Sequence, residues 1–193
     1  MKLKIGLINE ESLGEGILAE ELMMDGHFVN SYENQPGLLV ELSKFDPGLL
    51  IFNLSKPSKE ILEIIKIINF AQPKPIIVLA KKSGSINANE VIKSGVSSYI
   101  VDGVKPGRMK AIIDVAMARF LEHQEMCNEL NQFKEKLDDR KWVDKAKGIL
   151  MELKGMSEDD AYKAMRTMAM ENNRRLVDIA KNIISVSQIT LEK

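Results

Sequence analysis

Two groups of side chains in this 193-residue sequence have the types and spacings that chemistry requires. The first is the carboxylate pair Glu10 and Glu11, which follows a short apolar run near the N-terminus. Carboxylate oxygens are hard ligands, so this pair could bind a divalent cation weakly, and a solvated acidic loop is the simpler alternative. The second group is cationic and lies in the last third of the chain.

The cationic group combines arginines and lysines with two neighbouring amides. RNA loops are recognised through phosphates, splayed bases and stacking, and the planar guanidinium of arginine serves all three. The alternative is a solvated basic face, and charge alone does not decide between the two. The candidate RNA-binding residues are Arg140, Lys141, Lys145, Lys147, Arg166, Asn172, Asn173, Arg174 and Arg175.

The composition is that of a soluble globular protein, with 45% hydrophobic and 28% charged residues. The N-terminal apolar run is too short for a signal peptide and no apolar stretch is long enough to span a membrane, so we expect a cytoplasmic protein. A single cysteine, Cys127, excludes an internal disulfide and a cysteine-rich metal site. The net charge of −1 hides a mild asymmetry, because residues from Arg140 onward hold 11 Lys/Arg and 8 Asp/Glu.

Short apolar runs alternate with amphipathic segments over the first 105 residues. Near-continuous apolar runs are typical of parallel strands covered on both faces. The sequence therefore predicts a doubly wound, flavodoxin-like α/β domain with a five-stranded parallel sheet. The expected strands are 3–8, 28–32, 49–52, 76–79 and 98–101, and the expected helices are 12–25, 36–44, 58–70 and 86–94, with Asn34 and Pro36 marking a helix start.

A long helix should follow, because residues 109–137 contain neither glycine nor proline. Its heptad seam indicates a coiled-coil dimerisation helix over 107–140, and packing against its own domain is the alternative. His123 and Cys127 lack further metal ligands and are interpreted as interface residues. The seam consists of Ile113, Ala116, Phe120, His123, Cys127, Leu130, Lys134 and Leu137.

The last fifty residues predict three helical pieces. Gly155 is a plausible cap for the first piece, and Ser157 with the acids after it resembles a capping box that starts the second. Asn172-Asn173 breaks the second piece before a third begins. Met165 and Met168 fall on one face of the second helix and are interpreted as core rather than as a cofactor site. Because three short helices bury little surface, we expect contacts with a partner chain to stabilise this unit.

Residues 1–120 resemble the receiver domain of response regulators. That resemblance implies an acidic cluster after the first strand, an aspartate acceptor after the third, a hydroxyl after the fourth and a lysine after the fifth. Here Asn53 occupies the acceptor position, in IFNLSKP, and Ala80 replaces the hydroxyl. Asp102 takes the place of the lysine unless Lys105 substitutes for it, and Asn9 precedes Glu10 and Glu11 in the remnant of the acidic cluster. The resemblance thus implies a pseudo-receiver that is not phosphorylated.

Residues 138–190 resemble the ANTAR domain of transcription antiterminators, through AKGILM at 146–151, GMSE at 155–158, Ala161-Tyr162 and Asn172-Asn173. The stretch 97–120 is similar to NasT-type nitrate and nitrite regulators. The resemblance implies a homodimer that binds leader RNA hairpins and receives its signal from a sensor protein. It implies no cofactor, metal or enzymatic activity, and the sequence has no nucleophile–base pair. The alternative is a DNA-binding response regulator whose second and third helices mimic a helix-turn-helix.

Overall fold

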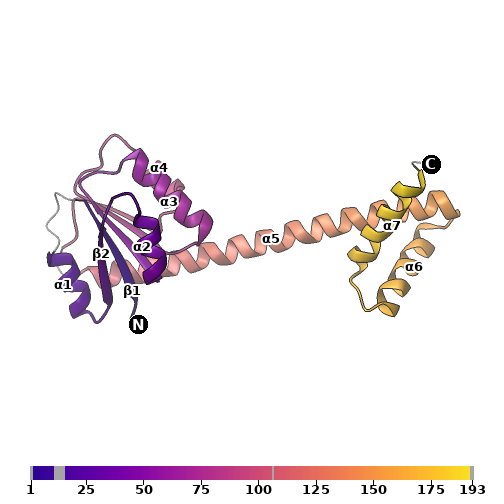
Figure 1. Ribbon diagram of the computed structural model, residues 1–193, viewed down its shortest axis with the longest axis horizontal. Coiled ribbons are helices and arrows are strands. Elements are labelled where there is room, and N and C mark those ends of the chain that lie inside the picture. The colour runs from indigo at the N-terminus through magenta and orange to yellow at the C-terminus, as the bar shows by residue number, and fades with distance from the viewer. Residues whose placement is uncertain (1, 11–15, 106, 192–193) are drawn as a thin grey trace. The chain divides into compact units, whose positions relative to one another are not determined.

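The computed structural model describes residues 2–10, 16–105 and 107–191. Five parallel strands form a sheet in the order β2-β1-β3-β4-β5 (Figure 1). Each strand lies over one of the predicted apolar runs, so the predicted doubly wound sheet is confirmed. The strands are β1 (Lys4–Asn9), β2 (Phe28–Glu33), β3 (Leu49–Leu54), β4 (Ile76–Ala80) and β5 (Ser98–Val101).

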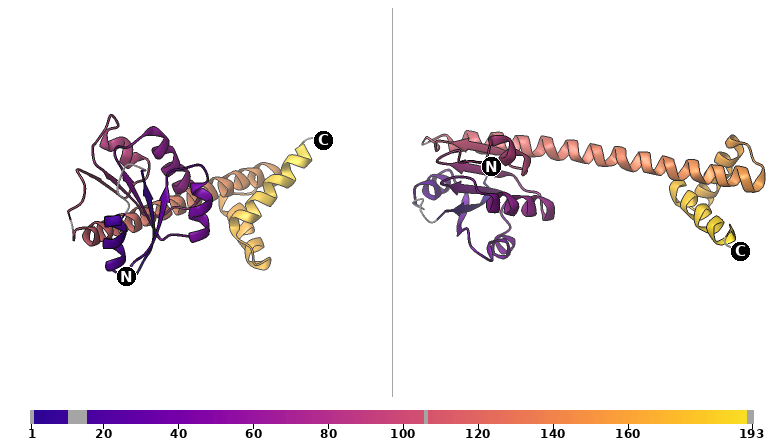
Figure 2. Two further views of the ribbon diagram at one scale, coloured as in Figure 1. Left: turned by 60° about the vertical axis from the view of Figure 1, so that its left-hand side comes forward. Right: turned by 90° about the horizontal axis from the view of Figure 1, so that it is seen from above.

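Helices cover both faces of this sheet (Figure 2). On one face, α1 (Gly16–Met24) and the first turns of α5 (Met109–Lys154) pack Leu22 and Ile113 against Leu7 and Ile51. The other face carries α2 (Leu38–Phe45), α3 (Lys59–Ala71) and α4 (Ala88–Lys93) over a core that includes Phe52. Both faces of β3 are therefore buried, which explains why its sequence is almost entirely apolar.

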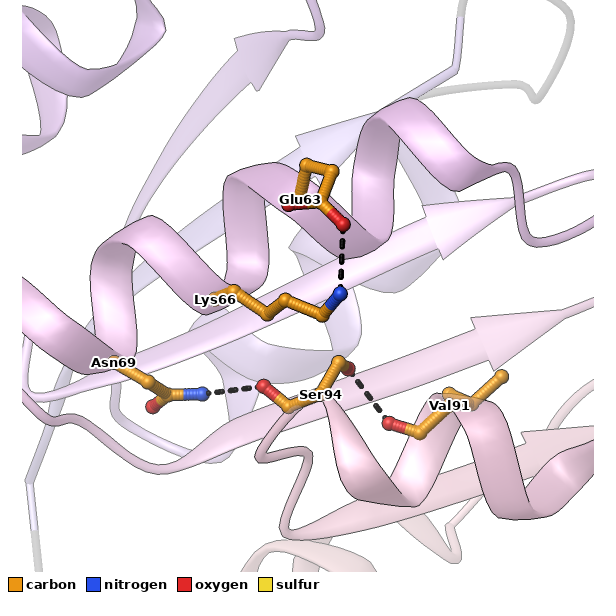
Figure 3. Close-up of polar contacts among 5 residues, drawn as sticks. All are labelled: Glu63, Lys66, Asn69, Val91 and Ser94. Atoms are coloured by element: carbon orange, nitrogen blue, oxygen red, sulfur yellow. Dashed lines mark hydrogen bonds and ion pairs between the residues drawn. The ribbon is translucent and has the colours of Figure 1, made fainter.

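A polar contact fastens α4 to the end of α3 (Figure 3). The Asn69 side chain donates hydrogen bonds to the carbonyls of Ser94 and Gly95, at 3.0 and 3.1 Å. Gly95 has a φ of +96°, and a Cβ built there would lie 2.2 Å from the Asn69 amide nitrogen. Only glycine suits this turn, because both its backbone conformation and its lack of a side chain are required.

The chain divides into two compact units, Met1–Gln124 and Glu125–Lys193, and α5 contributes to both. In the second unit, α6 (Glu158–Glu171) and α7 (Leu176–Leu191) pack against the C-terminal part of α5. Its small core includes Ala146, Leu150, Met165 and Ile184. Met165 is fully buried as predicted, but Met168 is 39% exposed and Ala169 takes its expected place in the core.

Two other local predictions differ from the structure. Helix α2 begins at Leu38 rather than at Pro36, because Gly37 adopts a φ of +99° immediately before it. The first two positions of the predicted heptad seam, Ile113 and Ala116, are buried in the core on one face of the sheet. The alternative of packing against its own domain therefore holds for the start of α5, and only the later part of the helix is available to a partner. None of the described helices is long and apolar enough to cross a membrane.

Candidate functional site

At the carboxyl edge of the sheet, two amides occupy the position of the expected phosphorylation chemistry. Asn9 and Asn53 are register partners on β1 and β3, and Asn53 Nδ2 donates a hydrogen bond of 2.9 Å to Asn9 Oδ1. Asn9 is only 1% exposed, and its own Nδ2 has no hydrogen-bond partner among the described residues. A neutral amide pair offers neither the charge that holds Mg²⁺ nor a nucleophilic carboxylate.

Glu10, which follows these amides at the end of β1, forms hydrogen bonds with the backbone at the end of β3. The Glu10 carboxylate accepts a hydrogen bond from the backbone N–H of Ser55, and the Glu10 N–H donates to the carbonyl of Asn53 at 3.1 Å. Both bonds join the end of β1 to the end of β3. Glu11 lies outside the described residues. Across the described residues, no three His, Cys, Asp or Glu side chains gather closely enough to form a metal site.

The C-terminal unit is shaped by the caps that the sequence predicts. Gly155, with a φ of +63°, ends α5, and the hydroxyl of Ser157 accepts the N–H of Asp160 to start α6. Asn173 adopts a φ of +49° in the turn that follows α6, where the Arg174 N–H donates to the carbonyl of Ala169. Asparagine tolerates this left-handed conformation better than most residues. The turn consequently places Arg174 and Arg175 directly before α7.

A groove of about 490 Å³ lies among α5, α6 and α7 of this unit. Its apolar part includes Val143, Leu176 and the half-exposed ring of Tyr162. Its charged part consists of two aspartates and three cations, which are Asp139, Asp144, Arg140, Lys147 and Arg175. We call this the groove below.

Carboxylates already bind every cation of the groove. Lys147 Nζ lies 2.7 Å from oxygens of both Asp144 and Glu158, and its side chain is only 15% exposed. The hydrogen bond that it accepts from Lys147 lowers the pKa of Asp144, and the hydrogen bonds that Lys147 donates to Asp144 and Glu158 raise the pKa of Lys147. Arg175 pairs with Asp139, and Arg140 Nε lies 3.8 Å from Asp144. The groove is therefore charge-compensated.

A second surface, which we call the hollow, lies at the turn between α6 and α7. It is lined by Arg166, Ala169, Met170, Asn173, Arg174 and Arg175. None of these lining residues is acidic, and within the described part of the chain no ion pair joins Arg166 or Arg174 to a carboxylate. The hollow therefore presents cationic charge to solvent.

The predicted RNA-binding residues thus fall into separate groups. Arg166, Asn173, Arg174 and Arg175 meet in the hollow, whereas Arg140 and Lys147 line the groove, and Arg175 contributes to both. Lys141 pairs with Asp138 on the surface of α5, and Lys145 and Asn172 are exposed beyond either surface. Sequence reasoning did not single out Tyr162 or Asp139 as site residues. The only available signal was the position of Tyr162 within the Ala161-Tyr162 motif.

Residues 131–184 match the ANTAR domain family, which covers the groove and the hollow. The chain is 26% identical to the transcriptional regulatory protein PdtaR of Mycobacterium tuberculosis over 182 residues, or 94% of this chain and 89% of that protein. It is 35% identical over 80 residues to the nitrate regulatory protein of Klebsiella oxytoca, or 42% of this chain and 20% of that one.

Among solved structures, the receiver domain of Klebsiella pneumoniae RstA matches with a TM-score of 0.52 at 17% identity, covering 58% of this chain and 97% of that one. This likeness shows the fold of the N-terminal unit. The chain therefore combines a unit with the fold of a receiver domain and, after it, a segment that matches the ANTAR domain.

Proposed function

We propose that this protein is a cytoplasmic RNA-binding regulator that prevents transcription termination by binding hairpins in nascent leader transcripts. Its relatives carry the names of regulators rather than enzymes, and one of them is called a nitrate regulatory protein. Nitrate as the signal for this chain is an analogy only. The ANTAR unit is the RNA-binding part, and the receiver-like unit is the part that a sensor protein contacts.

The hollow is the observation that carries this proposal. Three arginines and Asn173 line it, and among the described residues Arg175 is paired with Asp139 whereas Arg166 and Arg174 have no carboxylate partner. Uncompensated arginines favour phosphate, because each contact releases a condensed counterion and the guanidinium fork fits phosphate oxygens. The exposed side chain of Met170 adds an apolar surface beside these cations, against which a splayed base can pack.

The exposed apolar stripe in the middle of α5 supports a homodimer. Met126, Leu130, Phe133 and Leu137 are between 55% and 63% exposed. Their spacings of four, three and four residues place them on one helix face, as the seam of a coiled coil requires. Pairing two copies along this seam would bury the stripe and bring two ANTAR units into one molecule.

The receiver-like unit acts in this proposal as a protein-binding scaffold that phosphate does not switch. The Asn9–Asn53 pair supports this role, because the fold is intact where the acceptor chemistry is replaced. Control must then come from contacts on the surface of this unit, so the partner is a sensor protein.

A selection from a pool of paired RNA hairpins with randomised loops, using the full-length protein, tests the proposal. The winning RNA is then compared with duplex DNA of the same sequence by gel shift. We expect binding to the RNA alone. Arg166→Ala and Arg174→Ala should each weaken it, and Lys154→Ala removes a similar charge outside the hollow and the groove as a control. Equal or tighter binding to the DNA duplex would establish the rival function, a DNA-binding response regulator.

A further inference from the structure

Arg175 differs from the other two arginines of the hollow, because a carboxylate is already bound to it. Its Nη2 donates a hydrogen bond to Oδ2 of Asp139, a residue of α5 that lies thirty-six positions earlier in the sequence. Arg166 and Arg174 have no carboxylate partner among the described residues. The hollow therefore has two arginines that are available to an external anion and one that is already occupied.

A carboxylate and a phosphate compete for the same part of an arginine side chain. Both groups accept hydrogen bonds from the N–H groups of the guanidinium, and both are attracted by its charge. An RNA phosphate that approaches Arg175 must therefore displace Asp139 or bind a guanidinium whose charge is already neutralised. In either case Arg175 contributes less to RNA affinity than an unpaired arginine does.

The exposure of the two side chains shows that an external anion can reach this ion pair. The side chain of Arg175 is 70% exposed and that of Asp139 is 34% exposed, so the pair lies at the surface of the unit. Exposed ion pairs contribute little to stability, because water screens them. A phosphate can consequently displace Asp139 without disturbing the core, and the carboxylate should lower RNA affinity without preventing RNA binding.

We propose that Asp139 is an internal competitor of RNA phosphate, which pairs with Arg175 and limits the hollow to two effective phosphate ligands. This inference rests on the proposed RNA-binding function and names a residue that regulates the same site. Removal of the Asp139 charge should release Arg175, so that three arginines of the hollow become available to the RNA backbone.

The test measures filter binding of the full-length protein to the hairpin pair selected from the randomised pool, at several salt concentrations. Asp139→Asn should bind this RNA roughly fivefold to tenfold more tightly at low salt. The slope of log affinity against log salt concentration should become steeper by about one, because one more phosphate is neutralised. Asp139→Ser is a second variant without the charge and should behave in the same way.

Asp138→Asn is the matched control. It removes the same charge at the neighbouring position, but Asp138 is paired with Lys141, which does not line the hollow. This variant measures the general effect of a less negative surface on RNA binding. We expect its affinity and its salt slope to stay close to those of the parent protein.

A second substitution at Arg175 identifies the group that Asp139 releases. In the parent protein, Arg175→Ala should weaken RNA binding only slightly, because the guanidinium is already paired. In the Asp139→Asn background, the same substitution should remove the whole gain in affinity and flatten the salt slope by about one. The effect of Arg175→Ala must therefore depend on the residue at position 139.

Thermal melts followed by circular dichroism check that all these variants retain their helices. If Asp139→Asn and Asp139→Ser bind RNA more weakly than the parent does, Asp139 positions Arg175 for the RNA and the inference is wrong. The inference is also wrong if Asp138→Asn tightens binding equally, or if the gain survives Arg175→Ala. When Arg166→Ala and Arg174→Ala still weaken binding in these cases, the proposed function stands. If the parent protein selects no RNA from the pool, both fail together.

Discussion

At the carboxyl edge of the sheet, the side chains of Asn9 and Asn53 are hydrogen-bonded to each other. On the ANTAR unit, by contrast, Arg166 and Arg174 are exposed, and no carboxylate of the described residues is paired with them. The sheet is folded although the expected phosphorylation residues are replaced, because apolar side chains packed on both of its faces stabilise it. A polar site can therefore be lost while the scaffold remains as a surface for partners. The ANTAR unit shows the reverse, because its core has few residues and its surface carries two arginines, Arg166 and Arg174, that have no carboxylate partner among the described residues.

The strongest test of this contrast removes the link between two copies of the chain. A Leu130→Asp, Phe133→Asp double variant should become monomeric and lose most of its RNA affinity. Each buried side chain contributes about 2 kcal/mol, so the dimer should weaken by well over a hundredfold. Leu121→Asp is the control, because Leu121 is 56% exposed on the opposite face of α5. Light scattering measures the mass, and a double variant that stays dimeric would place the interface elsewhere.

Cysteine cross-linking then fixes which helix face is the seam. The heptad expected from sequence placed Cys127 on the dimer axis, whereas the exposed stripe places Met126 there. Under mild oxidation, a Met126→Cys, Cys127→Ser variant should form covalent dimers faster than the parent protein does. If the parent protein cross-links faster, the dimer seam is the one predicted from the sequence, which contains Cys127.

The second test asks whether the amide pair has ended phosphoryl chemistry. Incubation with acetyl phosphate and Mg²⁺ should leave the mass of the parent protein unchanged, because Asn53 offers no carboxylate to attack phosphorus. An adduct of one phosphoryl group that disappears in Asn53→Ala would contradict this. Asn9→Asp combined with Asn53→Asp should create Mg²⁺ binding beside Glu10, as measured by titration calorimetry, because carboxylates bind hard cations.

The fold could be predicted from sequence because its signals are local. Each strand is an apolar run, and Gly155, Ser157 and Asn173 mark helix ends through backbone preferences that belong to single residues. The α5 seam was partly wrong for a non-local reason. Periodicity shows that Ile113 lies on an apolar face, but it does not show that the receiver sheet already covers that face.

The candidate site was harder to predict because its electrostatics depend on residues far apart in the sequence. Lys147 looked like a phosphate ligand beside other cations, yet Glu158 reaches it from the next helix, eleven positions later. Arg175 is likewise compensated by Asp139, thirty-six positions earlier. Arg166 and Arg174 lie together in the hollow, because one short turn joins their helices.

The third test separates the hollow from the groove by salt. Phosphate contacts make the logarithm of affinity fall with the logarithm of salt concentration, and each lost contact flattens that slope by about one. Arg174→Ala should flatten the slope for every RNA tested. Lys147→Met should leave it nearly unchanged, because the ammonium is already neutralised by two carboxylates. Filter binding at several salt concentrations measures both, and an equal flattening by Lys147→Met would make it a phosphate ligand after all.

The smallest expected effect is on stability. The ion pairs of Lys147 with Asp144 and Glu158 link α5 to the start of α6. Lys147→Met keeps the length of the side chain but removes its ion pairs with Asp144 and Glu158. The expected result is a small decrease in the Tm of the protein, well below that of Met165→Ala, which empties part of a small core at a cost of about 2–5 kcal/mol.

The pH dependence identifies the ion pairs as the cause of that decrease. The pKa of Asp144 is lowered in the folded protein, so its contribution is present above the ordinary carboxyl pKa and is lost as the pH falls through the lowered value. The pKa of Lys147 is raised, so its contribution is present below the ordinary amine pKa and is lost as the pH rises through the raised value. The difference in Tm between parent and Lys147→Met should therefore be largest at neutral pH and shrink toward both extremes. A difference that does not change with pH would mean that the stem of Lys147, rather than its charge, joins the two helices.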